Sequence, residues 1–212
     1  MMVLLGISPA MMKPSALLLN ILVSAIATYQ FYKAGHFKKN LFLPFIILSV
    51  PFSFIGSKIS LADPVYKTIL GICLLIAVAC MLIKNTAIAG DKKQLPLWPA
   101  LGIGAGIGLI SGMIGIGGGI LLTPLLLLFR WADVKEAAAV SAPFILLNSI
   151  SGIIGLGSTG ISFTPEISAW VVAAAIGGIA GSYWGSKKFN NAALKYILSC
   201  VLVLAAAKLF IS

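Results

Sequence analysis

The chain has 212 residues, of which 60% are hydrophobic and only 9% charged, and its formal net charge is +10. Soluble domains contain about 25% charged residues, so this composition excludes an ordinary soluble protein and indicates an integral membrane protein. Nucleic-acid binding would need a folded reader module with a clustered basic face, and the sequence contains neither. The excess of Lys and Arg instead indicates the positive-inside bias of membrane-protein loops, and it is compatible with attraction of anionic lipids or of an anionic solute.

Six apolar segments approach the roughly 20 residues that a membrane-spanning helix needs. In chain order they are residues 15–32, 41–57, 66–83, 137–156, 166–186 and 194–211, and the longer segment 97–129 lies between the third and the fourth. The first segment is followed by others, so it is not a cleaved signal peptide. The sequence therefore predicts an all-α polytopic membrane protein with a single membrane domain.

The segment 97–129 is too long for one span, and three consecutive glycines at 117–119 and Pro124 interrupt it. A bilayer tolerates non-helical backbone only where protein or a water-filled cavity covers it. If the segment enters and returns on the same side, 11 Lys and Arg lie in the cytoplasmic loops and 2 outside, whereas a single crossing defies the positive-inside bias. We therefore expect a Gly-broken helical hairpin that turns at 115–119, either as two short helices or as a re-entrant pair.

An internal repeat organises the chain. Leu-Leu-Asn at 18–20 recurs at 146–148, Lys-Thr-Ile-Leu at 67–70 recurs as Lys-Tyr-Ile-Leu at 195–198, and Gly-Ser-Lys at 56–58 matches 185–187. Matches in one order and near one spacing predict a duplication, with a first repeat at 1–90 and a second at 91–212. With the hairpin between them, corresponding helices run in opposite directions, which is the inverted-repeat arrangement of many secondary transporters.

The first repeat lacks a copy of the Gly-rich segment, apart from a remnant at residues 3–9. We expect a start codon assigned too late or a truncated gene, or else a partner chain that supplies the missing hairpin.

Gly117, Gly118 and Gly119 are the first candidate binding residues. Glycines let successive backbone N–H groups point one way, and the helix that resumes at 119–120 carries a partial positive charge at its N-terminus, which suits an anion. The alternative is that these glycines only allow close helix packing. We expect that role for further glycines at small-xxx-small spacing, namely Gly102, Gly106, Gly108, Gly112, Gly177, Gly181 and Gly185.

Asn20 and Asn148 occupy the same repeat position inside apolar helices, with Ser15 and Ser141 close by. Two amides near a pseudo-two-fold axis offer N–H donors to an oxyanion from both sides, so all four residues join the predicted site. The alternative for each Asn is an interhelical hydrogen bond worth about 0.6 kcal/mol. Lys13 and Arg130 lie near membrane boundaries, where they attract an anion or simply snorkel to the interface.

The sequence offers no catalytic or metal site. Cys73, Cys80 and Cys200 lie in apolar segments without CxxC spacing, and His36 is the only histidine. We therefore expect neither an enzyme nor a bound cofactor or metal.

Residues 111–124, the 137–148 stretch and the region from Leu5 to Asn20 resemble the TauE/SafE sulfite exporter family of bacterial membrane permeases. The resemblance covers almost the whole chain. It implies a multi-pass plasma-membrane transporter of small sulfur anions, such as sulfite or organosulfonates, coupled to an ion gradient. The expected partners are such an anion and the lipid bilayer. The anion, the transport direction and a homo-oligomeric state stay open, and a non-transporting membrane scaffold or assembly protein is the alternative function.

Overall fold

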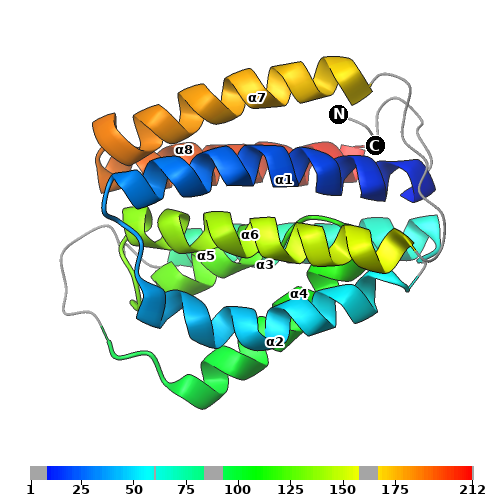
Figure 1. Cartoon of the computed structure of the whole chain (residues 1–212), viewed down its shortest axis with the longest axis horizontal. Helices are drawn as coiled ribbons and strands as arrows, with labels where there is room; N and C mark the ends of the chain where they lie inside the picture. The colour runs from blue at the N-terminus through cyan, green and yellow to red at the C-terminus, as the bar shows by residue number, and fades with distance from the viewer. Residues whose placement is uncertain (1–8, 60, 84–92, 158–166, 212) are drawn as a thin grey trace.

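In the computed structural model the described residues are 9–59, 61–83, 93–157 and 167–211, and they form helices with no strand among them (Figure 1). The elements are α1 (Pro9–Lys33), α2 (Lys39–Ser57), α3 (Asp63–Ile83), α4 (Leu97–Ile114), α5 (Gly119–Leu128), α6 (Val134–Gly157), α7 (Ile167–Tyr183), the π-helix η2 (Trp184–Lys188) and α8 (Asn191–Ile211). Five helices of the described part are long and apolar enough to cross a membrane. The predicted all-α polytopic fold is confirmed.

The basic loops lie at one end of the bundle. Figure 1 shows that α1, α5 and η2 end on its left side, where α2, α4, α6 and α8 begin. The described Lys and Arg residues of this lysine-rich end are Lys33, Lys38, Lys39, Lys93, Arg130, Lys135, Lys187 and Lys188. The positive-inside rule predicts that this end faces the cytoplasm.

The segment that contains α4 and α5 returns to the end at which it entered. The backbone N–H of Lys93 donates a hydrogen bond of 3.0 Å to the carbonyl oxygen of Arg130, which joins the start of α4 to the end of α5. Between the helices the chain reverses at Gly115, Gly117 and Gly118, whose φ angles are 83°, 72° and 78°. Such positive values favour glycine. The predicted Gly-broken hairpin is confirmed, and we call residues 115–118 the glycine turn.

Helix α5 is much shorter than α4. Its 10 residues extend about 15 Å, half of the roughly 30 Å of a bilayer core. The helix is therefore too short to cross, whereas α4, with 18 residues or about 27 Å, is long enough. The re-entrant form of the hairpin stays a prediction.

Helix α4 packs closely along α2 through three glycines. A Cβ atom built on Gly104, Gly108 or Gly112 would lie 2.1–2.3 Å from a backbone carbonyl oxygen of α2. Close packing was expected at Gly108 and Gly112, but Gly104 was missed. The same expectation was wrong for Gly102, Gly106, Gly177 and Gly181, because a Cβ atom there meets nothing within 4 Å.

This close approach yields a test of stability. Gly108→Ala should lower the free energy of unfolding by about 1–3 kcal/mol, because the new Cβ must push α4 away from the carbonyl oxygen of Ser49. Gly106→Ala is the matched control, since it adds the same methyl group to the same helix in open space. Thermal unfolding in detergent measures both variants. Equal melting temperatures for the two variants would contradict the close packing.

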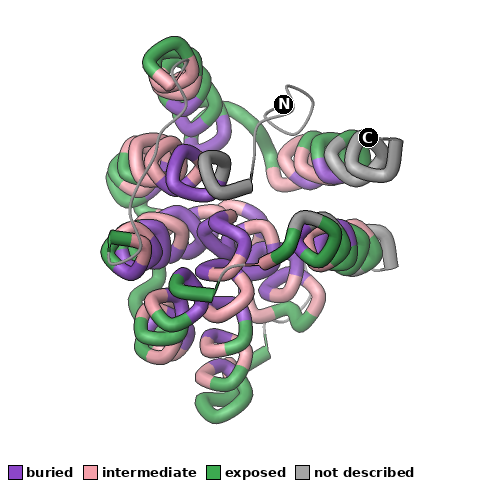
Figure 2. The backbone as a smooth tube through the Cα atoms, turned by 90° about the vertical axis from the view of Figure 1, so that its right-hand side faces the viewer, coloured by how far each residue is buried: buried purple, intermediate pink, exposed green. Residues whose placement is uncertain are grey.

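The bundle has a buried centre and an exposed periphery (Figure 2). Helix α6 packs against α1 and α2 and is the most buried of the candidate spans, whereas α7 packs mainly against α1 and has few buried residues. Helices α1 and α6 run in opposite directions in Figure 1. Their directions agree with an inverted repeat, and the repeat itself stays a prediction.

Candidate functional site

A pocket of about 440 Å³ opens beside the glycine turn. Residues of α1, α5, α6, α7 and α8 line it, and most of them are apolar or glycine. The polar residues of its wall are Asn20, Ser24, Thr123, Ser141 and Ser182. These side chains carry N–H and O–H donors and no charge. The wall therefore presents hydrogen-bond donors without an acidic group that would repel an anion.

The first turn of α5 forms one edge of the pocket. Gly118 precedes the helix in a left-handed conformation, and no side chain caps the helix. The carbonyl oxygen of Gly118 accepts hydrogen bonds of 3.1 Å from the N–H groups of Leu121 and Leu122, while Gly119 and Ile120 line the pocket. The leading N–H groups of a helix have no intrahelical acceptor and carry a partial positive charge. This edge therefore suits an anion.

Asn20 connects α1 to the glycine turn. Its Nδ2 donates a hydrogen bond of 3.3 Å to the carbonyl oxygen of Gly115, and the side chain also lines the pocket. An amide nitrogen carries two hydrogens, so one remains for a second acceptor. Asn20 is 13 residues before the end of α1, about 20 Å from the lysine-rich end, so it contacts the turn well inside the bundle.

Two buried hydroxyl groups without a partner flank the turn. The Oγ atoms of Ser111 and Ser149 have no hydrogen-bond partner, and both residues are fully buried. Ser149 Oγ lies 3.1 Å from the position that a Cβ of Gly117 would take, and Ser111 Cβ lies 3.4 Å from that of Gly118. An unsatisfied buried polar group costs about 1–3 kcal/mol. Neither residue lines the pocket, so these two donors lie behind its wall, next to the turn.

Ser141 lies on the α6 side of the same pocket. Its Oγ is 2.7 Å from Oγ1 of Thr123 on α5, and both side chains are buried. Beside them, a Cβ on Gly119 would lie 2.3 Å from the end of the Ile145 side chain, so a larger residue there would require Ile145 to move. The two hydroxyls join the helix start and Asn20 in one polar wall.

Asn148 and Ser15 lie outside this pocket wall. Asn148 is fully buried against α2, where its Oδ1 accepts a hydrogen bond of 2.8 Å from Ser49 and its backbone oxygen one of 2.9 Å from Ser53. Its Nδ2 donates to the carbonyl oxygen of Phe144 at 3.0 Å. The structure thus gives Asn148 the interhelical hydrogen bond that was the alternative. Ser15 is fully buried in α1 and does not line the pocket.

Lys13 is a buried cation beside the turn, and the sequence pattern had favoured a position at the interface. Its Nζ donates hydrogen bonds of 2.7 and 3.4 Å to the carbonyl oxygens of Ser57 and Ile59, at the end of α2. Its Cγ lies 3.0 Å from the position of a Cβ on Gly115. A cation at a helix C-terminus is favourable, and the aliphatic part of the Lys13 side chain packs against the glycine turn.

Of the predicted site residues, the structure brings Asn20, Ser141 and Gly119 together in the pocket wall and places Gly117 and Gly118 in the turn. Sequence reasoning missed Ser111 and Thr123 as site residues. Both lie near the two ends of the Gly-rich stretch 111–124, and this position in the sequence could have identified them as candidates.

Comparison with known proteins places the chain among transporters. A family model described as sulfite exporter TauE/SafE matches residues 1–209. A probable membrane transporter protein of Sinorhizobium fredii is 37% identical over 212 residues, which cover 98% of this chain and 86% of that relative. A probable membrane transporter protein of Methanocaldococcus jannaschii is 35% identical over 114 residues, 51% of this chain and 41% of that relative. No solved structure matches.

Proposed function

Because the chain belongs to the sulfite exporter TauE/SafE family and is a multi-pass membrane transporter, we propose that it moves a small sulfur-containing anion across the plasma membrane. Sulfite and small organosulfonates are the substrate class, and secondary transport driven by an ion gradient is the mode. The proposal rests on the family together with the chemistry of the pocket beside the glycine turn.

The observation that carries the proposal is the uncapped start of α5 at a pocket whose polar side chains are all uncharged. The helix N-terminus attracts the anion, and sulfur-bound oxygens can accept hydrogen bonds from Asn20 and from whichever hydroxyl of the Thr123–Ser141 pair does not donate to the other. The rest of the wall is largely apolar, which suits the alkyl part of an organosulfonate. Hydrogen bonds without a full countercharge hold an anion loosely enough to release it, as a transporter requires.

The predicted repeats at 1–90 and 91–212 supply a mechanism for this proposal. In inverted-repeat transporters one repeat rocks against the other around a midplane site. The pocket wall combines α1 of the first repeat with α5–α8 of the second, so such rocking would open it to either side. Both the division into two repeats and the rocking motion are part of the proposal.

Uptake of radiolabelled sulfite into proteoliposomes tests the substrate class. We expect saturable uptake that depends on an imposed ion gradient and that unlabelled sulfite or a small organosulfonate inhibits. Protein-free liposomes are the control for leakage. If neither sulfite nor labelled organosulfonates enter faster than in protein-free liposomes, under any gradient or orientation, the proposed substrate class is wrong.

A further inference from the structure

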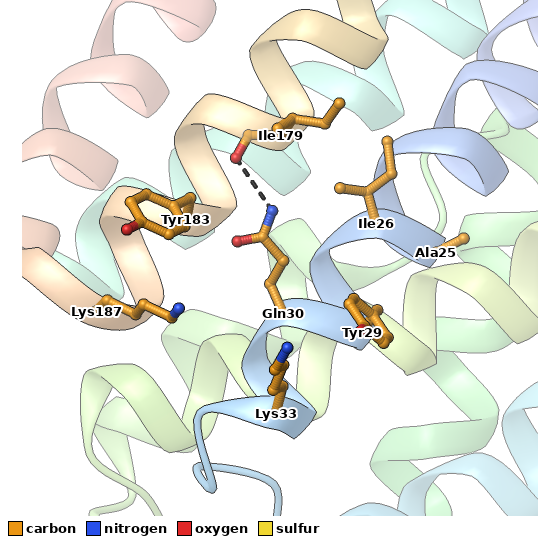
Figure 3. A pocket seen from close by; sticks show the side chains of 8 residues that line it. All are labelled: Ala25, Ile26, Tyr29, Gln30, Lys33, Ile179, Tyr183 and Lys187. Atoms are coloured by element: carbon orange, nitrogen blue, oxygen red, sulfur yellow. Dashed lines mark hydrogen bonds between the residues drawn. The ribbon is translucent and has the colours of Figure 1, made fainter.

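A second pocket, of about 560 Å³, lies between α1 and α7 and contains no residue of the first pocket (Figure 3). Figure 3 shows Lys33 and Lys187 at one end of it and Ile26 and Ile179 at the other. No acidic side chain lines it. The pocket is therefore cationic at one end and apolar at the other.

The cationic end lies at the membrane boundary. The candidate spans Lys13–Lys33 and Ile167–Lys188 both end there, on the lysine-rich side of the bundle. At 1.5 Å per helical residue, Ile26 lies about 10 Å deeper than Lys33, and Ile179 about 12 Å deeper than Lys187. The lysines are thus at the level of lipid headgroups, and the two isoleucines are at the level of acyl chains.

Both lysines are held over tyrosine rings in the same way. On α1, Lys33 Nζ lies 5.9 Å from the ring centroid of Tyr29, and on the α7 side Lys187 Nζ lies 4.8 Å from that of Tyr183. Each pair has i, i+4 spacing on its helix. Tyrosine at this depth is typical of the bilayer interface. The stacking keeps the ammonium groups at the pocket instead of extended into water.

The two helices are joined at the floor of the pocket, and its mouth is open. Gln30 Nε2 donates a hydrogen bond of 3.2 Å to the carbonyl oxygen of Ile179, which fixes α1 against α7. Tyr29 is 66% exposed and Ile179 54% exposed, so the described part of the chain leaves this surface to the surroundings. In the membrane these surroundings are lipid.

We propose that this pocket is a binding site for one anionic phospholipid. The phosphate lies at the ammonium groups of Lys33 and Lys187, and the acyl chains run along Ile26 and Ile179 toward the bilayer centre. Charge complementarity and the change from cationic to apolar lining with depth match this occupant, since basic pockets between helices on the cytoplasmic side recognise anionic lipid headgroups. The site is independent of the pocket at the glycine turn and of the anion that is transported.

Lipid binding to the purified full chain in neutral detergent tests this site. The variants are Lys33→Gln/Lys187→Gln and, as a control with the same loss of charge on the same side, Lys38→Gln/Lys39→Gln. Phosphatidylglycerol, phosphatidylcholine and inorganic phosphate are titrated separately, with bound lipid counted by native mass spectrometry. We expect the wild type and the control to bind one phosphatidylglycerol, and the pocket variant to bind it at least tenfold more weakly.

Two further variants separate binding from folding. Lys33→Arg/Lys187→Arg keeps both charges and should retain phosphatidylglycerol, whereas Ile26→Trp keeps both lysines, fills the apolar end and should weaken binding. Equal binding of phosphatidylglycerol by the wild type, the Gln pair and Ile26→Trp would overturn the proposal. Equal binding of phosphatidylcholine, or competition by inorganic phosphate at the same concentration, would also overturn it, the latter by showing a site for a free anion.

Discussion

Gly181→Trp should lower the initial rate of anion uptake at least tenfold without a comparable loss of stability. Gly181 lines the pocket beside the glycine turn, and a Cβ on it meets nothing within 4 Å. The backbone of α7 therefore accepts a side chain at this position. An indole ring here occupies the space between α7 and α1, which the anion needs if the pocket lies on its route.

The matched control is Gly106→Trp on α4. That glycine is also exposed with nothing within 4 Å of a Cβ, and it does not line the pocket. Uptake into proteoliposomes is divided by the amount of folded protein, and melting temperatures are compared in detergent. Wild-type uptake by Gly181→Trp would remove this pocket from the transport route, whereas a similar fall in both variants would point to a general effect of the bulky side chain.

The helices could be predicted closely because their signals are local. The apolar segment expected at 41–57 forms α2, Lys39–Ser57, and the segment expected at 66–83 forms α3, Asp63–Ile83. The earlier start of α3 has a simple reason, since Pro64 fits a first helical turn, where its missing N–H has no partner to lose. The hairpin was predictable from charge, because the Lys and Arg residues of the loops obey the positive-inside rule only if the chain returns to the side at which it entered.

Helix faces were harder to predict than helix bounds. Gly102 and Gly106 have the same i, i+4 spacing as Gly104 and Gly108, so each pair forms a stripe of small residues on α4. Spacing identifies the stripes but does not indicate which one meets α2. That choice depends on tertiary packing, and the structure selects the stripe that contains Gly104 and Gly108. The π-helix η2 depends on tertiary packing in the same way, and its Ser186 carbonyl oxygen lies 3.2 Å from the ring Nε2 of His36.

The candidate site was predictable where it depends on one segment and not where it depends on pairing between helices. The glycine turn and the start of α5 lie within one stretch of sequence. Asn20 and Asn148 share a position in the predicted repeat, but Asn20 contacts the turn and Asn148 contacts Ser49. Equivalent positions in a repeat therefore need not have equivalent partners, and the two amides should respond differently to mutation.

Asn20→Leu should reduce uptake about 10- to 100-fold and change the melting temperature little. A hydrogen bond to a charged group contributes about 1.5–3 kcal/mol, and 1.4 kcal/mol corresponds to a factor of ten. The bond that the variant loses within the protein, to the carbonyl oxygen of Gly115, is long at 3.3 Å and only partly buried. Its contribution to stability should therefore be small compared with its contribution to anion binding.

Asn148→Leu should have the opposite effects. It removes the acceptor of the buried Ser49 hydroxyl and with it one of the hydrogen bonds between α6 and α2, so the free energy of unfolding should fall by about 1–3 kcal/mol. Uptake per folded protein should stay close to that of the wild type, because Asn148 does not line the pocket. A change within about threefold corresponds to less than the 1.4 kcal/mol of a tenfold change. Melting curves and uptake measured on the same preparations separate the two roles. A fall in uptake equal to that of Asn20→Leu, at an unchanged melting temperature, would instead indicate that both amides bind the anion. An unchanged melting temperature shows that the packing of α2 against α6 is intact, so the lower uptake would come from a lost contact between Asn148 and the anion.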